Sequence, residues 1–81
     1  MTMASELQPL ASLPAGTSAI VREVNLAPDF HQRLMEMGIL TGTRIELVRF
    51  APLGDPVEIR VRGYNLTLRK HEAEKVLVSL V

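Results

Sequence analysis

The 81-residue chain contains no cysteine, and this absence rules out a group of sites at once. Disulfides, thiolate metal sites, iron–sulfur clusters and cysteine nucleophiles all require a thiol. Tryptophan is also absent, and aromatic residues make up only 4% of the chain. Barrels that bind single-stranded nucleic acid rely on aromatic side chains that stack on the bases. The composition therefore argues against that class of protein.

Neither sign of charge predominates, because nine Lys and Arg residues balance nine Asp and Glu residues. The two signs alternate along the chain, whereas a nucleic-acid partner favours a clustered basic surface. We therefore expect no nucleic-acid partner. Long apolar segments are missing too, since no run approaches the ~20 residues that a membrane-spanning helix needs. Residues 1–10 lack the basic and apolar segments of a secretory signal, so we expect a cytoplasmic protein without direct membrane insertion.

The chain does contain 47% hydrophobic residues, which is a globular composition. We expect a single domain over residues 1–81, with a modest core, because a domain of this size buries only about 60% of the surface that its unfolded chain exposes. Residues 1–6 carry no pattern and are expected to be frayed.

Five segments have the composition or the alternation of strands. They are residues 17–24, 43–50, 57–61, 64–68 and 76–80. The first two are partly apolar on both faces, which indicates that each strand contains a bulge. For the first, the alternative is a strand with other parts of the protein packed on both of its faces. The third and fourth would pair through a two-residue Arg62-Gly63 loop that sets Val61 opposite Tyr64. A longer loop through Asn65 is the alternative, because arginine is unusual in such a turn.

A short helix is predicted between the first two strands. Asp29 precedes Gln32 by three residues, which is the spacing of a capping box, and this predicts a helix that starts at Phe30. Phe30, Leu34 and Met37 then form one apolar stripe, with Met37 buried.

The predicted helix ends at Gly38, in the left-handed conformation, with Leu34 in contact with Ile39. A single helical turn is expected within residues 70–75. Five strands, one short helix after the first strand and a helical turn before the last predict a mainly β, SH3-like, partly open barrel.

Three segments resemble the FeoA (ferrous iron transport protein A) family. Residues 33–43 (RLMEMGILTGT) are similar to its helix-to-strand junction, and residues 48–57 (VRFAPLGDPV) to its signature loop. Residues 68–70 (LRK) together with Ala73 resemble its closing turn, and the similarity runs from about Leu10 to Val78. The resemblance implies an SH3-like fold and a cytosolic accessory protein of FeoB, the membrane GTPase that imports ferrous iron. It also implies a likeness to the C-terminal domain of metal-dependent repressors.

No motif of catalysis is present. The chain has no GxxxxGK[ST] phosphate loop, no G-x-S-x-G elbow and no H-E-x-x-H pair. We therefore expect neither enzymatic activity nor a cofactor.

Metal ligands are few and poorly spaced. The candidates are His31 with Glu36, and His71 with Glu72 and Glu74, of which His71 and Glu74 could share a helical face. One imidazole and one carboxylate do not make a closed site. We expect ordinary surface histidines and no specific metal site.

A hydrophobic docking patch is the favoured hypothesis for function. Met35 points about a hundred degrees away from the apolar stripe and should be exposed. Leu53 lies in a rigid loop, where it either projects outward or folds back over the barrel. Together with Tyr64 they would form the patch, with Arg49 or Arg69 at its polar rim.

Three further interpretations stay open. The chain could be a regulatory domain related to metal-dependent repressors, which binds a protein, a peptide or a transition metal. It could associate weakly with itself through an exposed strand edge. Arg62, at a hairpin tip, could also be donated to the active site of a partner GTPase.

Overall fold

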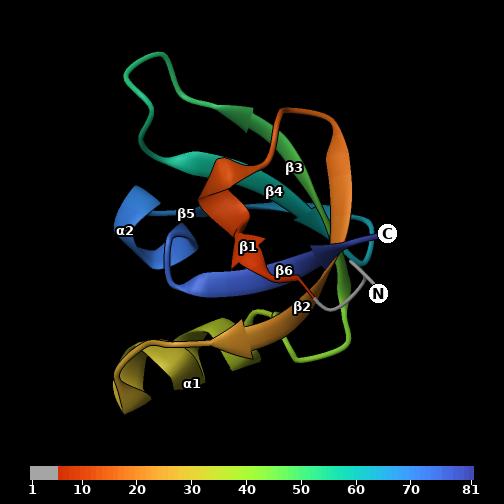
Figure 1. The fold of residues 1–81 in the computed structure, drawn as a ribbon. Coiled ribbons are helices and arrows are strands. Elements are labelled where there is room, and N and C mark those ends of the chain that lie inside the picture. Colours follow the sequence, from red (N-terminus) through yellow and green to blue (C-terminus); the bar gives the residue numbers. More distant parts are fainter. Residues whose placement is uncertain (1–5) are drawn as a thin grey trace.

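The strands of the described residues, 6–81, form one antiparallel sheet that curls into a partly open barrel, as seen in a computed structural model (Figure 1). The strand order across the sheet is β1-β6-β2-β3-β4-β5. In chain order the elements are β1 (Gln8–Pro9), the 3₁₀ helix η2 (Leu10–Ser12), β2 (Thr17–Val24), α1 (Pro28–Glu36), β3 (Arg44–Phe50), β4 (Val57–Val61), β5 (Tyr64–Leu68), α2 (Lys70–Ala73) and β6 (Val76–Leu80). Except for Glu6, the predicted frayed segment lies outside the described residues.

The β4–β5 hairpin has the register predicted from its alternation. Val61 lies opposite Tyr64, and the pairing continues to the other end of the hairpin. Its loop has two residues, Arg62 and Gly63, which both have positive φ, at 53° and 90°. Two left-handed residues are the mark of a type I′ turn, whose twist matches that of the strands. The short loop is therefore confirmed, and the longer loop through Asn65 is not formed.

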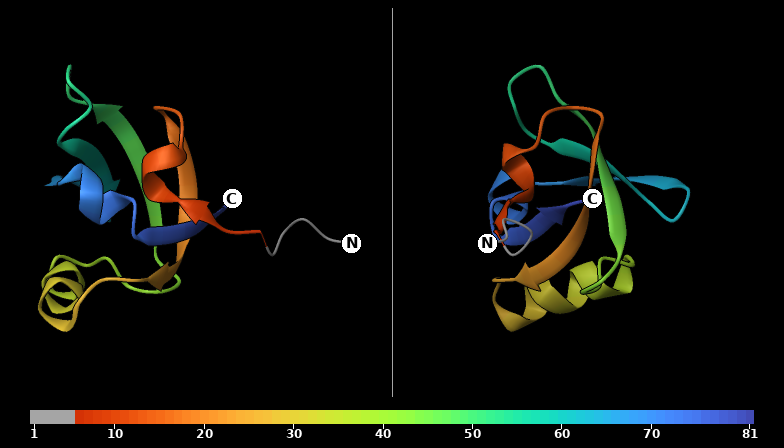
Figure 2. Two further views of the ribbon diagram at one scale, coloured as in Figure 1. Left: turned by 60° about the vertical axis from the view of Figure 1, so that its left-hand side comes forward. Right: turned by 45° about the vertical axis from the view of Figure 1, so that its right-hand side comes forward.

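Bulges bend the two longest strands. The register of β2 against β6 shifts between Val21 and Glu23, and that of β3 against β4 shifts between Leu47 and Arg49. A bulge adds one residue to one strand and increases its local twist. This confirms the prediction from the two-sided apolar pattern, and it lets so small a sheet curl (Figure 2).

The core lies inside the curl of the sheet. It consists of fully or almost fully buried apolar residues from most of the elements, namely Leu10, Leu13, Ala19, Val21, Leu34, Ile39, Ile45, Leu47, Val57, Ile59, Val61, Leu68, Ala73, Val76 and Val78. Burial of such side chains contributes about 25 cal/mol per Å² of apolar surface removed from water. The core thus connects α1 and η2 to every strand except the short β1.

One strand and one helix were not predicted. β1 pairs with β6 through Gln8 and Pro9, and η2 follows it directly. A two-residue strand is too short to show alternation, and its proline is tolerated because β1 is an edge strand. The segment is nevertheless anchored, because Leu10 and Leu13 are buried. Residues 6–81 therefore contain six strands, one more than the five expected.

The predicted start of α1 is wrong by two residues. The helix begins at Pro28, its N-cap is Ala27, and no side chain caps it. Proline suits the first helical position because its fixed φ is already helical and its missing N–H would be unpaired there. Asp29 consequently lies inside the first turn, and Gln32 donates a hydrogen bond to Glu36 (3.4 Å) and does not take part in a capping box.

The end of α1 is as predicted. Gly38 has φ 95°, and the Ile39 N–H donates to the Leu34 carbonyl over 2.9 Å. This is the Schellman arrangement, which satisfies carbonyls at the helix end. The predicted stripe is only partly buried, however. Leu34 is inaccessible, Met37 is half-buried and Phe30 is 41% exposed.

Candidate functional site

A groove of about 580 Å³ runs along the outer side of α1. Its lining is largely apolar and consists of Leu26, Pro28, His31, Gln32, Met35, Glu36 and Leu40. Met35 is 48% exposed here and Leu40 is 37% exposed. We call this the α1 groove; it places the predicted docking residue Met35 on a concave apolar surface.

The loop between β3 and β4 presents Leu53 to solvent. Two backbone hydrogen bonds hold the loop, from the Gly54 N–H to the Ala51 carbonyl (2.7 Å) and from the Ala51 N–H to the Pro56 carbonyl (3.0 Å). Leu53 is 95% exposed. Of the two arrangements considered for this residue, the structure has the outward one, and Leu53 does not cap the barrel.

The predicted docking residues do not come together in one patch. Leu53 precedes β4 and Tyr64 follows it, so they lie at opposite ends of that strand. Met35 is on α1, which lies at the other end of the molecule from the β3–β4 loop (Figure 1). Tyr64 is 64% exposed. The single patch is therefore corrected to separate exposed positions, which a sequence without tertiary contacts cannot place.

The two arginines of the predicted polar rim make different contacts. The Arg49 Nε donates to Glu58 over 2.9 Å, and the Asn65 amide donates to the other oxygen of that carboxylate over 2.7 Å. These two hydrogen bonds, that of Asn65 first, hold the pKa of Glu58 below its ordinary value. Arg69 is the residue before α2, and its side chain lies beside Pro56 and Thr67, two residues that also lie beside Arg49.

A buried carboxylate lies between the two helices. Glu72 is 2% exposed, and it accepts hydrogen bonds from the Arg33 guanidinium of α1 and from the Arg69 N–H (3.1 Å). Arg33 also lies over the Phe30 ring, 5.6 Å from its centroid. We call Arg33, Arg69 and Glu72 the capping cluster. It joins α1 to α2. Both oxygens of the Glu72 carboxylate, a candidate metal ligand in the sequence, accept hydrogen bonds within this cluster.

The remaining metal candidates are dispersed. His31 lines the α1 groove, whereas the His71 ring lies perpendicular to that of Phe30, with ring centroids 6.2 Å apart. Glu74 is exposed beyond α2. Among residues 6–81, no group of three or more His, Cys, Asp or Glu side chains is arranged to hold a metal ion.

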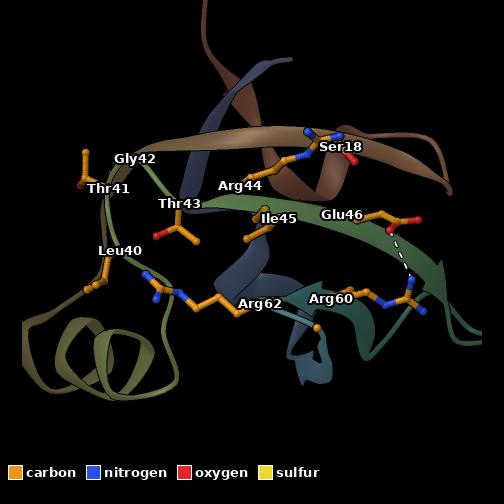
Figure 3. A pocket seen from close by; sticks show the side chains of 11 residues that line it. Ser18, Leu40, Thr41, Gly42, Thr43, Arg44, Ile45, Glu46, Arg60 and Arg62 are labelled. Carbon is orange, nitrogen blue, oxygen red and sulfur yellow. Dashed lines mark ion pairs between the residues drawn. The ribbon is translucent and has the colours of Figure 1, made fainter.

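A second groove, of about 660 Å³, was not found from the sequence (Figure 3). We call it the arginine groove. It is lined by Ser18, Leu40, Thr41, Gly42, Thr43, Arg44, Ile45, Glu46, Arg60, Arg62 and Gly63. The alternation in β4 could have indicated that Arg60 faces solvent, because the apolar residues on either side of it, Ile59 and Val61, are buried. The proximity of Arg44 required the β3–β4 pairing.

The curled, partly open sheet with its short helices defines an SH3-like domain, and a solved relative is described as a prokaryotic SH3 domain protein. The FeoA domain model matches residues 8–80. The chain therefore belongs to the FeoA domain family, as its motifs predicted.

Similar proteins agree with this assignment. A ferrous iron transport protein A/FeoB fusion protein of Porphyromonas gingivalis is 39% identical over 72 residues, which are 89% of this chain and 8% of the fusion protein. The solution structure of the FeoA protein of Chlorobium tepidum has a TM-score of 0.88 at 40% identity, over 91% of this chain and 70% of that one. The Stenotrophomonas maltophilia FeoA, solved in complex with zinc, has a TM-score of 0.76 at 34% identity, over 89% of each chain.

A manganese-dependent transcriptional repressor shares the fold, with a TM-score of 0.84, but only 13% identity over 93% of this chain and 42% of that one. This likeness confirms the fold relationship and carries no function. Within residues 6–81, no helix is both long and apolar enough to cross a membrane.

Proposed function

We propose that this protein is a non-enzymatic, cytoplasmic accessory protein of ferrous iron uptake, which docks on the cytosolic part of a FeoB-type membrane GTPase and modulates it. The observation that carries the proposal is the Porphyromonas gingivalis relative, in which a transport protein A and a FeoB transporter are one polypeptide. A fusion keeps two domains at high effective concentration, which is useful when the two act together.

Two exposed apolar positions support docking. The α1 groove around Met35 can receive an apolar side chain of the transporter, and Leu53 can insert into a pocket on it. Both are held by ordered backbone, Met35 in α1 and Leu53 in its hydrogen-bonded loop. An apolar side chain on a rigid support can bind with little loss of backbone entropy. Tyr64, Arg49 and Arg69 are exposed as well, and each would contribute a further contact at its own position on the surface.

The test is a calorimetric titration against the cytosolic GTPase domain and against the complete transporter in detergent, with and without GTP. Binding that weakens at least tenfold in Met35→Asp or in Leu53→Asp, with thermal unfolding unchanged, supports the proposal. The two variants are made separately because the residues lie on different surfaces. Val81→Asp, at a terminal apolar residue that is 68% exposed, is the matched control.

Absence of binding in every nucleotide state would overturn the docking function. Binding that neither variant weakens would keep the partner but reject both anchors.

A further inference from the structure

We propose that the arginine groove binds the carboxylates of an extended acidic peptide segment. Three guanidinium groups and one carboxylate line this groove, in a chain that has no net charge. The proposal stands apart from docking on the transporter, because it names a chemical class of ligand and depends on other residues.

The positive charge of the groove is largely unneutralised. Arg60 forms an ion pair with Glu46 at 3.6 Å, but Arg44 and Arg62 have no ion pair or side-chain hydrogen bond within residues 6–81. In Figure 3 the Arg62 side chain extends from the hairpin tip toward Leu40 and Thr43. Guanidinium groups bind carboxylates through two parallel hydrogen bonds, so unpaired ones in a groove are suited to such a ligand.

The backbone of Arg62 is a second, independent observation. Its φ of 53° makes it the one non-glycine residue with positive φ in the described chain. The left-handed conformation costs roughly 1–2 kcal/mol for an ordinary L-residue, and asparagine is the usual choice at the first position of a type I′ turn. An arginine here is unfavourable for the turn itself. Such local strain is found where a side chain has a role beyond folding.

The remaining lining favours a peptide over a nucleotide. No aromatic side chain lines the groove, so a base would have nothing to stack on. The hydroxyls of Ser18, Thr41 and Thr43 offer additional donors to carboxylates or to a peptide backbone. Leu40 lines both this groove and the α1 groove. An acidic segment that contains an apolar residue could therefore place its carboxylates on the arginines and its apolar side chain beside Leu40.

The experiment uses two capped synthetic peptides, Glu-Glu-Leu-Glu-Glu and Gln-Gln-Leu-Gln-Gln, titrated into the ¹⁵N-labelled chain at low salt. We expect the acidic peptide to shift the amide signals of Thr41 to Glu46 and of Arg60 to Gly63, with an affinity that falls as salt is raised. The glutamine peptide should not bind. Arg62→Asn should weaken binding about fivefold, which corresponds to ~1 kcal/mol.

Arg62→Asn is informative because it places the preferred residue in the turn and so should not unfold the hairpin. Lys75→Asn, which removes one positive charge outside the groove, is the matched control and should leave the affinity unchanged apart from the small effect of net charge. Equal loss in both variants, equal binding of both peptides, or shifts confined to another surface would overturn the proposal. Tighter binding of inorganic pyrophosphate at the same amides would assign the groove to phosphate and would also overturn it.

Discussion

Two regions of this small barrel use arginine and glutamate side chains in opposite ways. In the capping cluster, the carboxylate of Glu72 is 2% exposed and accepts hydrogen bonds from both Arg33 and the Arg69 backbone. In the arginine groove, the arginines are exposed and Glu46 is partly buried, and the ion pair of Arg60 with Glu46 is long at 3.6 Å.

The difference follows from the cost of removing a charge from water. A buried carboxylate is tolerated only when partners satisfy its oxygens, so Glu72 requires Arg33. An exposed pair gains little, typically below 1 kcal/mol, so arginines at the surface can exchange one partner for another. The capping cluster is therefore a structural element, whereas the arginine groove can change partners without loss of the fold.

The largest effect should come from breaking the capping cluster. Arg33→Met leaves the buried Glu72 carboxylate with one backbone donor, and we expect a loss of about 3 kcal/mol in the free energy of unfolding. The measurement is urea denaturation followed by circular dichroism. Glu72→Gln removes the buried charge and leaves unpaired only Arg33, which is half-exposed to water. It should therefore lower the free energy of unfolding by less than Arg33→Met.

The control is Arg49→Met, which breaks an exposed hydrogen-bonded pair with Glu58. It should cost no more than about 0.5 kcal/mol. If Arg33→Met and Arg49→Met lowered the free energy of unfolding equally, burial would not distinguish these two ion pairs. The proposed contrast between a buried and a surface pair would then be wrong.

Two of the left-handed positions, Gly38 and Arg62, offer a sharper comparison at smaller scale. Gly38, at the end of α1, has φ 95°, and a Cβ added there would meet Val61 at 3.7 Å, an ordinary contact. Gly38→Ala should therefore lower stability by about 1 kcal/mol, through backbone strain alone. Arg62→Asn should raise stability by about 0.5 kcal/mol, because asparagine accepts this conformation more readily.

Thermal unfolding of both variants checks this pair of predictions. A stabilised Arg62→Asn that also binds the acidic peptide less tightly would separate the role of Arg62 in recognition from its role in the hairpin. A destabilised Arg62→Asn would show that arginine is the better residue for this turn and would remove the argument from strain.

Most of the fold follows from local patterns. The alternation of β4 and β5 predicts their register because a slip by one residue would turn Val61 and Tyr64 to the other face. Gly38 similarly marks the end of α1. β1 could not be predicted, because a two-residue strand exists only through its partner β6. The start of α1 was misplaced because two signals compete there, and proline at the first helical position prevailed over the spacing of Asp29.

The sites were less predictable than the fold. The exposure of Met35 follows from helical periodicity, but the distance between Met35 and Leu53 depends on how the sheet curls. The arginine groove combines Arg44 of β3 with Arg60 and Arg62, and only the β3–β4 pairing brings them together. The partner of Glu72 was likewise hidden, since Arg33 lies 39 residues away in the chain.

The smallest predicted effect concerns the partly exposed carboxylate of Glu58. Donors on Asn65 and Arg49 stabilise its ionised form, so its pKa in the folded protein lies below the ordinary value of 4.5. A lowered folded-state pKa gives a contribution to stability that is complete above the unfolded-state pKa and is lost as the pH falls through the folded-state value. Below about pH 4.5, the wild type should therefore lose stability more steeply than Glu58→Gln.

Asn65→Ala, which removes the first of the two donors, should also make the loss of stability with falling pH less steep than in the wild type. Urea denaturation between pH 3 and pH 6 measures all three proteins. A Glu58→Gln variant with the wild-type slope would show that this carboxylate gains nothing from its donors, and that surface pairs outside the arginine groove are as free to change partners as the pair within it.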